Sequence, residues 1–419
     1  MAPSSGKNRR MSVLLLFLLL APHSEPLSVG DGKPFARIED AVKAAHTGDE
    51  IDVYPKASGY DGTAVLVRTP GLRFVGKLEK IGLDGTGFEY SGSGNMPRAI
   101  FQIDPGADGV TIENFELKNA HNRSFNGAGV RINQADRVTV RNCDIHGNDM
   151  GIMSNGIDGN PHAGEDQLID HCAVHGNGNS GNPGYNHNLY LGGTSVTVQF
   201  CTIDHSLTGH NLKSRAHFTL VKYCAISSSS NRELDFVEAW DTRRPNSNAV
   251  LIGNVIQKAT DSSGNRTVIH FGQENGRRDG AIFLINNTIK TPYVSAVLDL
   301  SAPTVSARLV NNVIENTDQA KPILAGIENG ASLSKLSGGY NVISPAYSIE
   351  GTLIDPQTLF TDPRRNQSAG RGRKPLPFPP GRASYTDGSG NRVPAELKYF
   401  HSPTAGWQKV SAPQIGAGD

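Results

Sequence analysis

The sequence predicts an all-β protein: a single right-handed parallel β-helix, or solenoid, with a helix capping its N-terminal end and an irregular tail after it. Three observations support this prediction. Glycine is abundant, at 47 of 419 residues, while aromatic residues make up only 7%. A short block with alternating apolar residues recurs about every 23 to 33 residues. Long amphipathic helical stretches are missing between these blocks.

The N-terminus has the pattern of an export signal. Lys7, Arg9 and Arg10 precede an apolar run from Val13 to Ala21, which is too short to span a bilayer. We predict a signal peptide over residues 1–27, with an uncleaved anchor as the alternative, and therefore a secreted or periplasmic protein. No later segment has the composition of a membrane span. The balance of 40 basic and 40 acidic residues gives no reason to expect nucleic acid as a partner.

Residues 35–55 predict the N-terminal cap. In "FARIEDAVKAAH", the apolar residues Ile38, Ala41, Val42 and Ala45 would share one face of a short helix, and a turn and a strand follow it. The open end of a solenoid exposes apolar side chains and unpaired backbone groups, so a helix is expected to cover it.

The repeated blocks define the coils of the solenoid. Examples are "VTIENFEL" (110–117), "VTVRNCDI" (138–145), "VTVQFCTI" (196–203) and "ARLVNNVI" (307–314). One inward position is occupied on successive coils by Phe115, Cys143, Cys172, Cys201, Cys224, Asn254, Asn287, Asn312 and Asn341. Equivalent positions stack about 4.8 Å apart in parallel strands. We therefore predict a ladder of buried free thiols, which is favoured over two disulfides, followed by an internal amide ladder.

The predicted β-helix domain spans residues 28–354. The remaining segment, 355–419, is rich in Pro and Gly, carries a run of basic residues and lacks strand periodicity. We expect this tail to be irregular and to lie on or near the solenoid. We expect the protein to be a monomer.

A second set of strands predicts a polar stripe on the outside. The aligned segments are "NLYLG" (188–192), "NLKSR" (211–215), "ELDFV" (233–237) and "VIHFG" (268–272). Side-chain alternation predicts that Tyr190, Lys213, Asp235 and His270 stack outward on four consecutive coils. Outward neighbours would be Asn188, Asn211 and Glu233 on one side and Arg215 on the other, with His187, His210 and Arg232 just before the strands. A surface ion-pair network is the alternative interpretation of this stripe.

With these marks the chain resembles the right-handed parallel β-helix proteins of the pectate-lyase-like superfamily over about residues 30–350. More narrowly, "HNLYLG", "GHNLKSRA" and "VIHFGQENGRRDGAIFLINNTI" are similar to a group of bacterial exported β-helix proteins. The resemblance implies the fold. It does not single out one function, because the superfamily holds lyases, hydrolases, esterases, epimerases and adhesins. Neither the calcium-binding aspartate set of the pectate lyases nor the paired aspartates of the polygalacturonases is present.

A linear, acidic polysaccharide is the predicted substrate, and β-elimination is the favoured reaction. This chemistry needs a cation to neutralise the uronate carboxylate, a base to remove the neighbouring proton and an acid to protonate the leaving oxygen. Lys213 is the candidate base, Arg215 the neutralising cation, and Tyr190 or His210 the acid. Asp235 beside Lys213 would keep the amine charged. In that case Lys213 and Arg215 both bind the carboxylate, and His210 or Tyr190 is the base.

Two alternatives to a lyase stay open. Glu233 and Asp235, two residues apart on one strand, could serve as the carboxyl pair of a glycoside hydrolase. A protein that binds glycans at the cell surface without cleaving them is the other alternative. The sequence does not name the sugar, the linkage or the mode of cleavage.

The remaining polar residues of the stripe are predicted to contact the sugar chain. They are Asn188, Asn211, Glu233, Asp235, His270 and His187. No cofactor or metal site is predicted. Calcium bound through Glu233, Asp235 and the asparagines is the open alternative, whereas the histidines lack the compact spacing of a zinc site.

Overall fold

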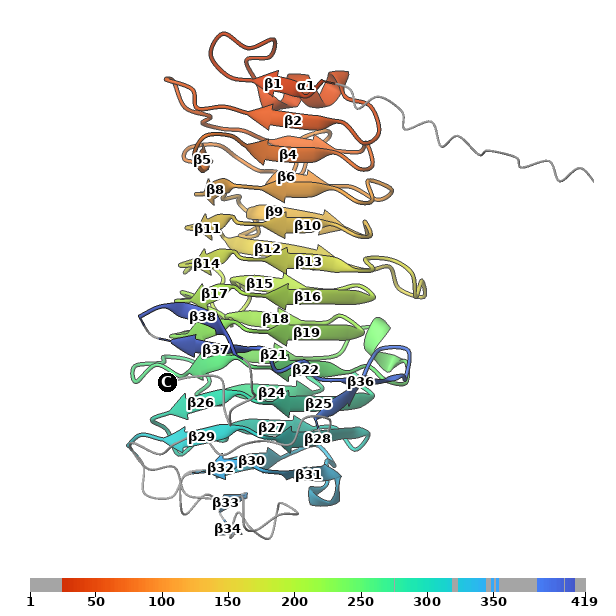
Figure 1. The fold of residues 1–419 in the computed structure, drawn as a ribbon, viewed down its shortest axis with the longest axis vertical. Coiled ribbons are helices and arrows are strands. Elements are labelled where there is room, and N and C mark those ends of the chain that lie inside the picture. Colours follow the sequence, from red (N-terminus) through yellow and green to blue (C-terminus); the bar gives the residue numbers. More distant parts are fainter. Residues whose placement is uncertain are drawn as a thin grey trace, which may run out of the picture.

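The computed structural model describes residues 25–274, 276–318, 323–343, 348–349, 352–353, 383–402 and 404–410. Three long sheets run along one axis, and each coil between the two ends of the solenoid adds one parallel strand to each sheet. Figure 1 shows the coils stacked from the cap at the N-terminal end down to β34. The predicted β-helix is confirmed, and right-handed crossovers are the rule for parallel strands.

Sheet B carries the predicted polar stripe. In stacking order its strands are β3 (Val65–Val67), β6 (Ala99–Ile103), β9 (Ala128–Asn133), β12 (Met150–Asn155), β15 (Leu189–Leu191), β18 (Leu212–Ser214), β21 (Leu234–Phe236), β24 (Ile269–Gly272), β27 (Leu298–Ser301), β30 (Ile323–Ile327), β33 (Ser348–Ile349) and β34 (Thr352–Leu353). The last pair, β33 and β34, is antiparallel.

Sheets A and C form the other two walls. Sheet A contains β1 (Leu27–Val29), β2 (Glu50–Val53), β4 (Arg73–Gly76), β7 (Thr111–Glu113), β10 (Thr139–Arg141), β13 (Gln167–Asp170), β16 (Ser195–Gln199), β19 (Phe218–Lys222), β22 (Ala249–Ile252), β25 (Gly280–Ile285), β28 (Val305–Val310) and β31 (Leu336–Gly339). Sheet C contains β5 (Ile81–Asp84), β8 (Phe115–Lys118), β11 (Asp144–His146), β14 (Ala173–His175), β17 (Thr202–Asp204), β20 (Ala225–Ser227), β23 (Val255–Gln257), β26 (Thr288–Thr291), β29 (Val313–Asn316) and β32 (Val342–Ile343).

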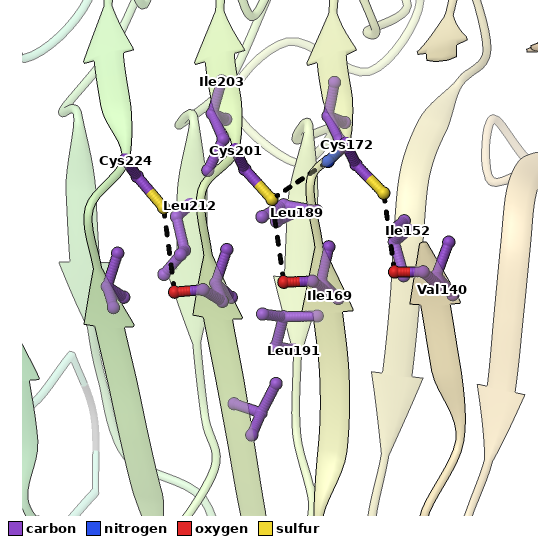
Figure 2. Close-up of a cluster of buried hydrophobic side chains, with 14 of the residues drawn as sticks. Val140, Ile152, Ile169, Cys172, Leu189, Leu191, Cys201, Ile203, Leu212 and Cys224 are labelled. Carbon is purple, nitrogen blue, oxygen red and sulfur yellow. Dashed lines mark hydrogen bonds between the residues drawn. The ribbon is translucent and has the colours of Figure 1, made fainter. Parts of the chain in front are cut away.

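The cysteine and asparagine ladders lie where sheet A turns into sheet C. The four cysteines are buried free thiols, as predicted. Figure 2 shows the sulfur atoms of Cys172, Cys201 and Cys224 in a row, each directed at a backbone carbonyl of the preceding coil, such as Cys201 Sγ at 3.6 Å from Ile169 O. The asparagines continue this role. Nδ2 of Asn287 donates to Leu251 O at 2.9 Å and to Oδ1 of the next asparagine at 3.0 Å. Both predicted ladders are confirmed.

The cap is formed by helix α1 (Ile38–Ala44), whose side chains Ile38 and Ala41 are fully buried against the first coil. Its position at the N-terminal end matches the prediction (Figure 1). Two short 3-10 helices, Asp241–Arg243 and Leu333–Lys335, lie in loops. Among the residues described, no helix is long and apolar enough to cross a membrane. Most of the predicted signal peptide, residues 1–24, lies outside the described residues.

Part of the C-terminal tail forms hairpins where the sequence predicted irregular chain. Strands β35 (Ser384–Thr386) and β36 (Arg392–Pro394) pair, as do β37 (Tyr399–Ser402) and β38 (Gly406–Lys409). The tail returns along the solenoid to its middle coils (Figure 1). There Tyr399 and Trp407 lie edge-on to the ring of Tyr223, at 4.9 and 5.7 Å between centroids. Residues 354–382 of the linker lie outside the described residues.

Candidate functional site

The predicted outward column exists in the predicted order. Backbone register pairs Tyr190 with Lys213, Lys213 with Asp235, and Asp235 with His270 across β15, β18, β21 and β24. The leucine and phenylalanine residues between them point into the core. The column continues to Met153 on one side and to Asp299 on the other.

This face is not a solvated sheet surface. Lys213, Asp235 and His270 are buried, and only Tyr190 and Arg215 keep partial exposure, at 27% for the Arg215 side chain. Burial makes unpaired charges costly, so the contacts among these groups must be nearly complete. The interpretation as a loose surface ion-pair network therefore does not describe the stripe.

Asp235 is the centre of the site. Its carboxylate is 0% exposed and contacts four side chains. Oδ2 lies 3.2 Å from Nζ of Lys213 and 3.3 Å from Nε2 of His210. Oδ1 lies 2.8 Å from Nδ1 of His270 and 3.2 Å from Nη1 of Arg232. Burial alone would raise the pKa of Asp235, but His210, His270 and Lys213 hold this pKa well below its usual value. Asp235 is thus a fixed anion that orders the cations around it.

His270 is held between Asp235 and Ser301. Its Nδ1 donates to the carboxylate, and its Nε2 lies 2.5 Å from Oγ of Ser301. This connectivity is that of a hydrolytic Ser-His-Asp triad. However, Ser301 is only 1% exposed. Its Oγ also accepts from the backbone N–H of Gln273 at 3.0 Å and donates to the backbone carbonyl of Gln273 at 3.1 Å. A substrate cannot reach this oxygen, so Ser301 is a positioning residue for His270.

Lys213 and Arg215 converge on one further carboxylate, that of Glu274 in the loop after β24. Nζ of Lys213 lies 2.5 Å from Oε1 and Nη2 of Arg215 lies 2.8 Å from Oε2. Nε of Arg215 donates to Oη of Tyr190 at 2.9 Å. These two cations form what we call the carboxylate fork. Because Glu274 is 32% exposed, the fork lies at the mouth of the site.

The two histidines before the strands lie behind the fork. The rings of His187 and His210 stack at 5.0 Å, and His187 also stacks on Tyr190 at 5.5 Å. Nδ1 of His187 accepts the backbone N–H of His210, so its proton is on Nε2. Burial lowers the pKa of His210 to about 4 and that of His187 well below its usual value. Both imidazoles are therefore neutral at pH 7.

Three predicted contact residues lie inside the solenoid, which is a correction. Asn188, Asn211 and Glu233 are fully buried at the corner between sheets C and B. Nδ2 of Asn188 donates to Oδ1 of Asn211 at 2.8 Å, and Nδ2 of Asn211 donates to Oε2 of Glu233 at 2.6 Å. Alternation fails here because these residues precede the strands, and their amides turn inward to bind backbone carbonyls such as Asp204 O.

Glu233 ends this internal ladder beside a buried lysine. Its Oε1 lies 3.5 Å from Nζ of Lys258, and neither side chain is exposed. Burial raises the pKa of Glu233 to about 7 although Lys258 favours its ionised form. The prediction that Glu233 and Asp235 point outward together is therefore wrong, and this pair cannot flank a glycosidic bond.

Sequence reasoning missed two participants, Glu274 and Ser301. The sequence places Arg232 just before its strand, as it does His210 one coil earlier, but indicates no role for it. Glu274 is the second residue after β24, in "GQENGRRDG", where the side chain of Arg215 reaches it. Ser301 is the last residue of β27 and pairs in register with Gly272 of β24. Its contact with His270 could not be predicted from sequence, because only packing on Gly272 makes room for it.

The site carries a small positive excess and a neighbouring hollow. The cations are Lys213, Arg215 and Arg232, and the carboxylates are Asp235 and Glu274. On the same face of sheet B, a hollow of about 440 Å³ lies over β27 and β30, with Arg232 at its edge. Within the described ranges, no three His, Cys, Asp or Glu side chains group closely enough to hold a metal ion.

Comparisons with known proteins concern the fold. No protein-family model matches the chain, and no curated protein matches it. In fold, the chain is a parallel β-helix protein. Similar solved structures include pectate lyase Pel9A (11% identity, 94% of this chain and 96% of that chain, TM-score 0.47). Others are DFA-IIIase from Arthrobacter chlorophenolicus A6 (11%, 84% and 97%, 0.39) and a pectin methylesterase from Yersinia enterocolitica (11%, 79% and 95%, 0.35).

Proposed function

We propose that this β-helix protein binds an acidic polysaccharide along sheet B and cleaves it by β-elimination. The observation that carries the proposal is the carboxylate fork. Lys213 and Arg215 hold the two oxygens of one carboxylate at 2.5 and 2.8 Å, which is the arrangement that a uronate carboxylate would need. In the proposed complex, the substrate carboxylate takes the place of the partly exposed Glu274.

The electrostatics of the site support this assignment. The buried Asp235 keeps Lys213 in place, and the ion pair between them explains why the amine is a carboxylate ligand and not the base. A carboxylate neutralised by two cations withdraws electrons from the adjacent carbon. The proton on that carbon thereby becomes more acidic, which is the difficult part of the elimination.

Tyr190 is the proposed proton carrier. It is the accessible member of the column, and its Oη accepts from Nε of Arg215 at 2.9 Å, which holds the hydroxyl beside the carboxylate fork. The base removes the proton from C5, the C4–O bond breaks, a C4=C5 double bond forms, and the leaving oxygen takes up a proton. The imidazole of His210 is neutral but buried, and we assign it to the support of Asp235 and Tyr190. His187 has the same supporting role through its stacking on Tyr190.

The test is a screen of acidic and neutral polysaccharides with two readouts. A lyase produces ultraviolet absorbance from the new double bond together with new reducing ends. Arg215→Ala and Lys213→Ala should each reduce this rate by at least about 100-fold, as loss of a charge-stabilising donor does. The melting temperature of Arg215→Ala should stay close to that of the wild type, because this side chain is partly exposed. If both variants keep full activity, the proposed site is wrong.

Hydrolysis is the second candidate, with Glu274 as its accessible carboxyl. Asp235 and Glu274 both contact Nζ of Lys213, but Asp235 has no exposed surface and could act only through its neighbours. Hydrolysis would produce new reducing ends without ultraviolet absorbance, and Glu274→Gln should abolish their production. Binding without either readout would assign the site to glycan recognition alone.

A further inference from the structure

The hollow over β27 and β30 has the lining of a sugar site. Its volume of about 440 Å³ falls within the usual range for small-ligand pockets. Carboxylates, hydroxyls, an amide and a guanidinium surround it, and isoleucine and alanine side chains supply apolar surface. The lining residues that matter here are Arg232, Thr267, Asp299, Gly326, Ile327 and Glu328.

Asp299 is fixed with one oxygen available to a ligand. Oδ2 accepts from Oγ1 of Thr267 at 2.8 Å, which sets the orientation of the carboxylate. Oδ1 has no protein donor among the described residues, although the residue is largely buried. Gly326 makes room for this oxygen, because a Cβ there would come within 2.2 Å of Oδ1. A sugar hydroxyl could donate to this oxygen.

Charge decides which kind of sugar fits. Two carboxylates, Asp299 and Glu328, line the hollow, and its one guanidinium, Arg232, is already paired with Asp235. An anionic sugar unit is therefore repelled here, in contrast to the carboxylate fork. Hydroxyl groups, which donate to carboxylates, are the complementary chemistry. Arg232 Nε is buried without a protein partner among the described residues and adds a donor.

We propose that this hollow binds an uncharged sugar unit of the same chain whose acidic unit lies at the carboxylate fork. Asp299 follows Lys213 by three coils in the outward column, which corresponds to about 14 Å along the groove. A few linked sugar rings span this distance. The substrate class is thus a heteropolysaccharide with acidic and uncharged units. The inference rests on the proposed function for the acidic unit.

The experiment measures sugar binding by NMR titration of the full chain. The probes are the methyl glycosides of glucose, galactose, mannose and rhamnose, with methyl glucuronoside and methyl glucosaminide as charged counterparts. At least one uncharged glycoside should bind at millimolar concentration. Asp299→Asn and Glu328→Gln should each weaken it about fivefold or more, as expected for one hydrogen bond. Glu328 is exposed, so its replacement tests the hollow without risk to folding.

Arg215→Ala separates this inference from the proposed function. It should leave binding of the uncharged glycoside unchanged, because Arg215 belongs to the fork. The inference is overturned if no uncharged glycoside binds, if both variants bind it as well as the wild type, or if a charged glycoside binds more tightly in the hollow. Elimination activity on a uronate polymer together with any of these results would leave the proposed function intact. Glycoside binding without elimination would contradict the proposed function and the acidic unit of the substrate, and would leave the uncharged sugar site in the hollow.

Discussion

At the residue scale, the site depends on one buried anion. Asp235 has no exposed surface, yet nitrogen atoms of four neighbouring side chains lie 2.8 to 3.3 Å from its two oxygens. Each of those neighbours is held in one orientation by this contact. The accessible groups, Tyr190 and Arg215, are thereby positioned by residues that a substrate does not touch.

Glu274 should compete with an acidic substrate. Glu274→Gln removes the charge that occupies the carboxylate fork, so affinity for uronate oligosaccharides should rise about fivefold, as expected for a partly exposed ion pair. Titration calorimetry at two salt concentrations measures the effect. Glu79→Gln, an equal charge change on an exposed N-terminal coil, is the matched control. Unchanged or weaker binding by Glu274→Gln would show that this carboxylate does not occupy the substrate site.

His210 should make stability depend on pH. Its folded pKa of about 4 lies below the usual value for histidine, so the unfolded chain binds a proton first as pH falls. Stability from this group is fully present above about pH 6.5 and decreases toward pH 4, by about 2 kcal/mol at pH 5. His187 acts in the same direction. Urea unfolding of His210→Gln should show a correspondingly smaller change between pH 7 and pH 5.

The exposed His162 supplies the control for this measurement. His162→Gln should leave the pH dependence of the wild type unchanged, because its ring is largely in solvent. An identical pH dependence in His210→Gln and in the wild type would contradict the assignment of His210 as a buried neutral imidazole.

At the element scale, one inward position per coil joins sheet A to sheet C. Cysteine and asparagine both direct a donor at the carbonyl of the preceding coil, but they differ in strength. The Cys201 contact is 3.6 Å long through a weak S–H donor, whereas Asn287 makes contacts of 2.9 and 3.0 Å through its amide. The asparagine section of the ladder should therefore contribute more to cohesion between coils.

Alanine substitutions should separate the two sections of the ladder. Asn287→Ala leaves buried carbonyl groups without donors and should cost about 2–4 kcal/mol of unfolding free energy. Cys201→Ala removes a small apolar group and a weak donor and should cost about 1 kcal/mol. Chemical unfolding of both variants measures the difference. A larger loss for Cys201→Ala would contradict the proposed division of roles.

At the scale of the whole molecule, the C-terminal tail covers the outer face of sheet A. The strands β22 and β25, with sequences AVLI and GAIFLI, lack the alternation of a half-exposed strand. Their outward residues form a second apolar cluster with Ala383 and Tyr385 of the tail. Strands that are buried on both faces consist of unbroken runs of apolar residues, and here the tail covers the second face.

Removal of the tail should destabilise the middle coils without damage to the groove. A chain that ends before Ala383 exposes Val250, Ile252, Phe283 and Ile285, which now pack beneath it. The melting temperature should fall by several degrees, and binding of a dye specific for apolar surface should increase. Binding of uronate oligosaccharides at sheet B should persist. A truncated chain with unchanged stability and no dye binding would show that the cluster contributes little.

The sequence by itself determined the coil repeat, the inward ladders, the cap helix and the outward column from Tyr190 to His270. These follow from local alternation and from a period that the chain repeats coil after coil, so each could be predicted from a short window. The tertiary structure decided where alternation stops. Asn188, Asn211 and Glu233 turn inward because corner backbone groups need partners. Glu274 meets Lys213 because a loop folds back over a coil two turns earlier, a contact 61 residues apart in sequence. Long-range packing of this kind has no periodic signal, and it gives the carboxylate fork its shape.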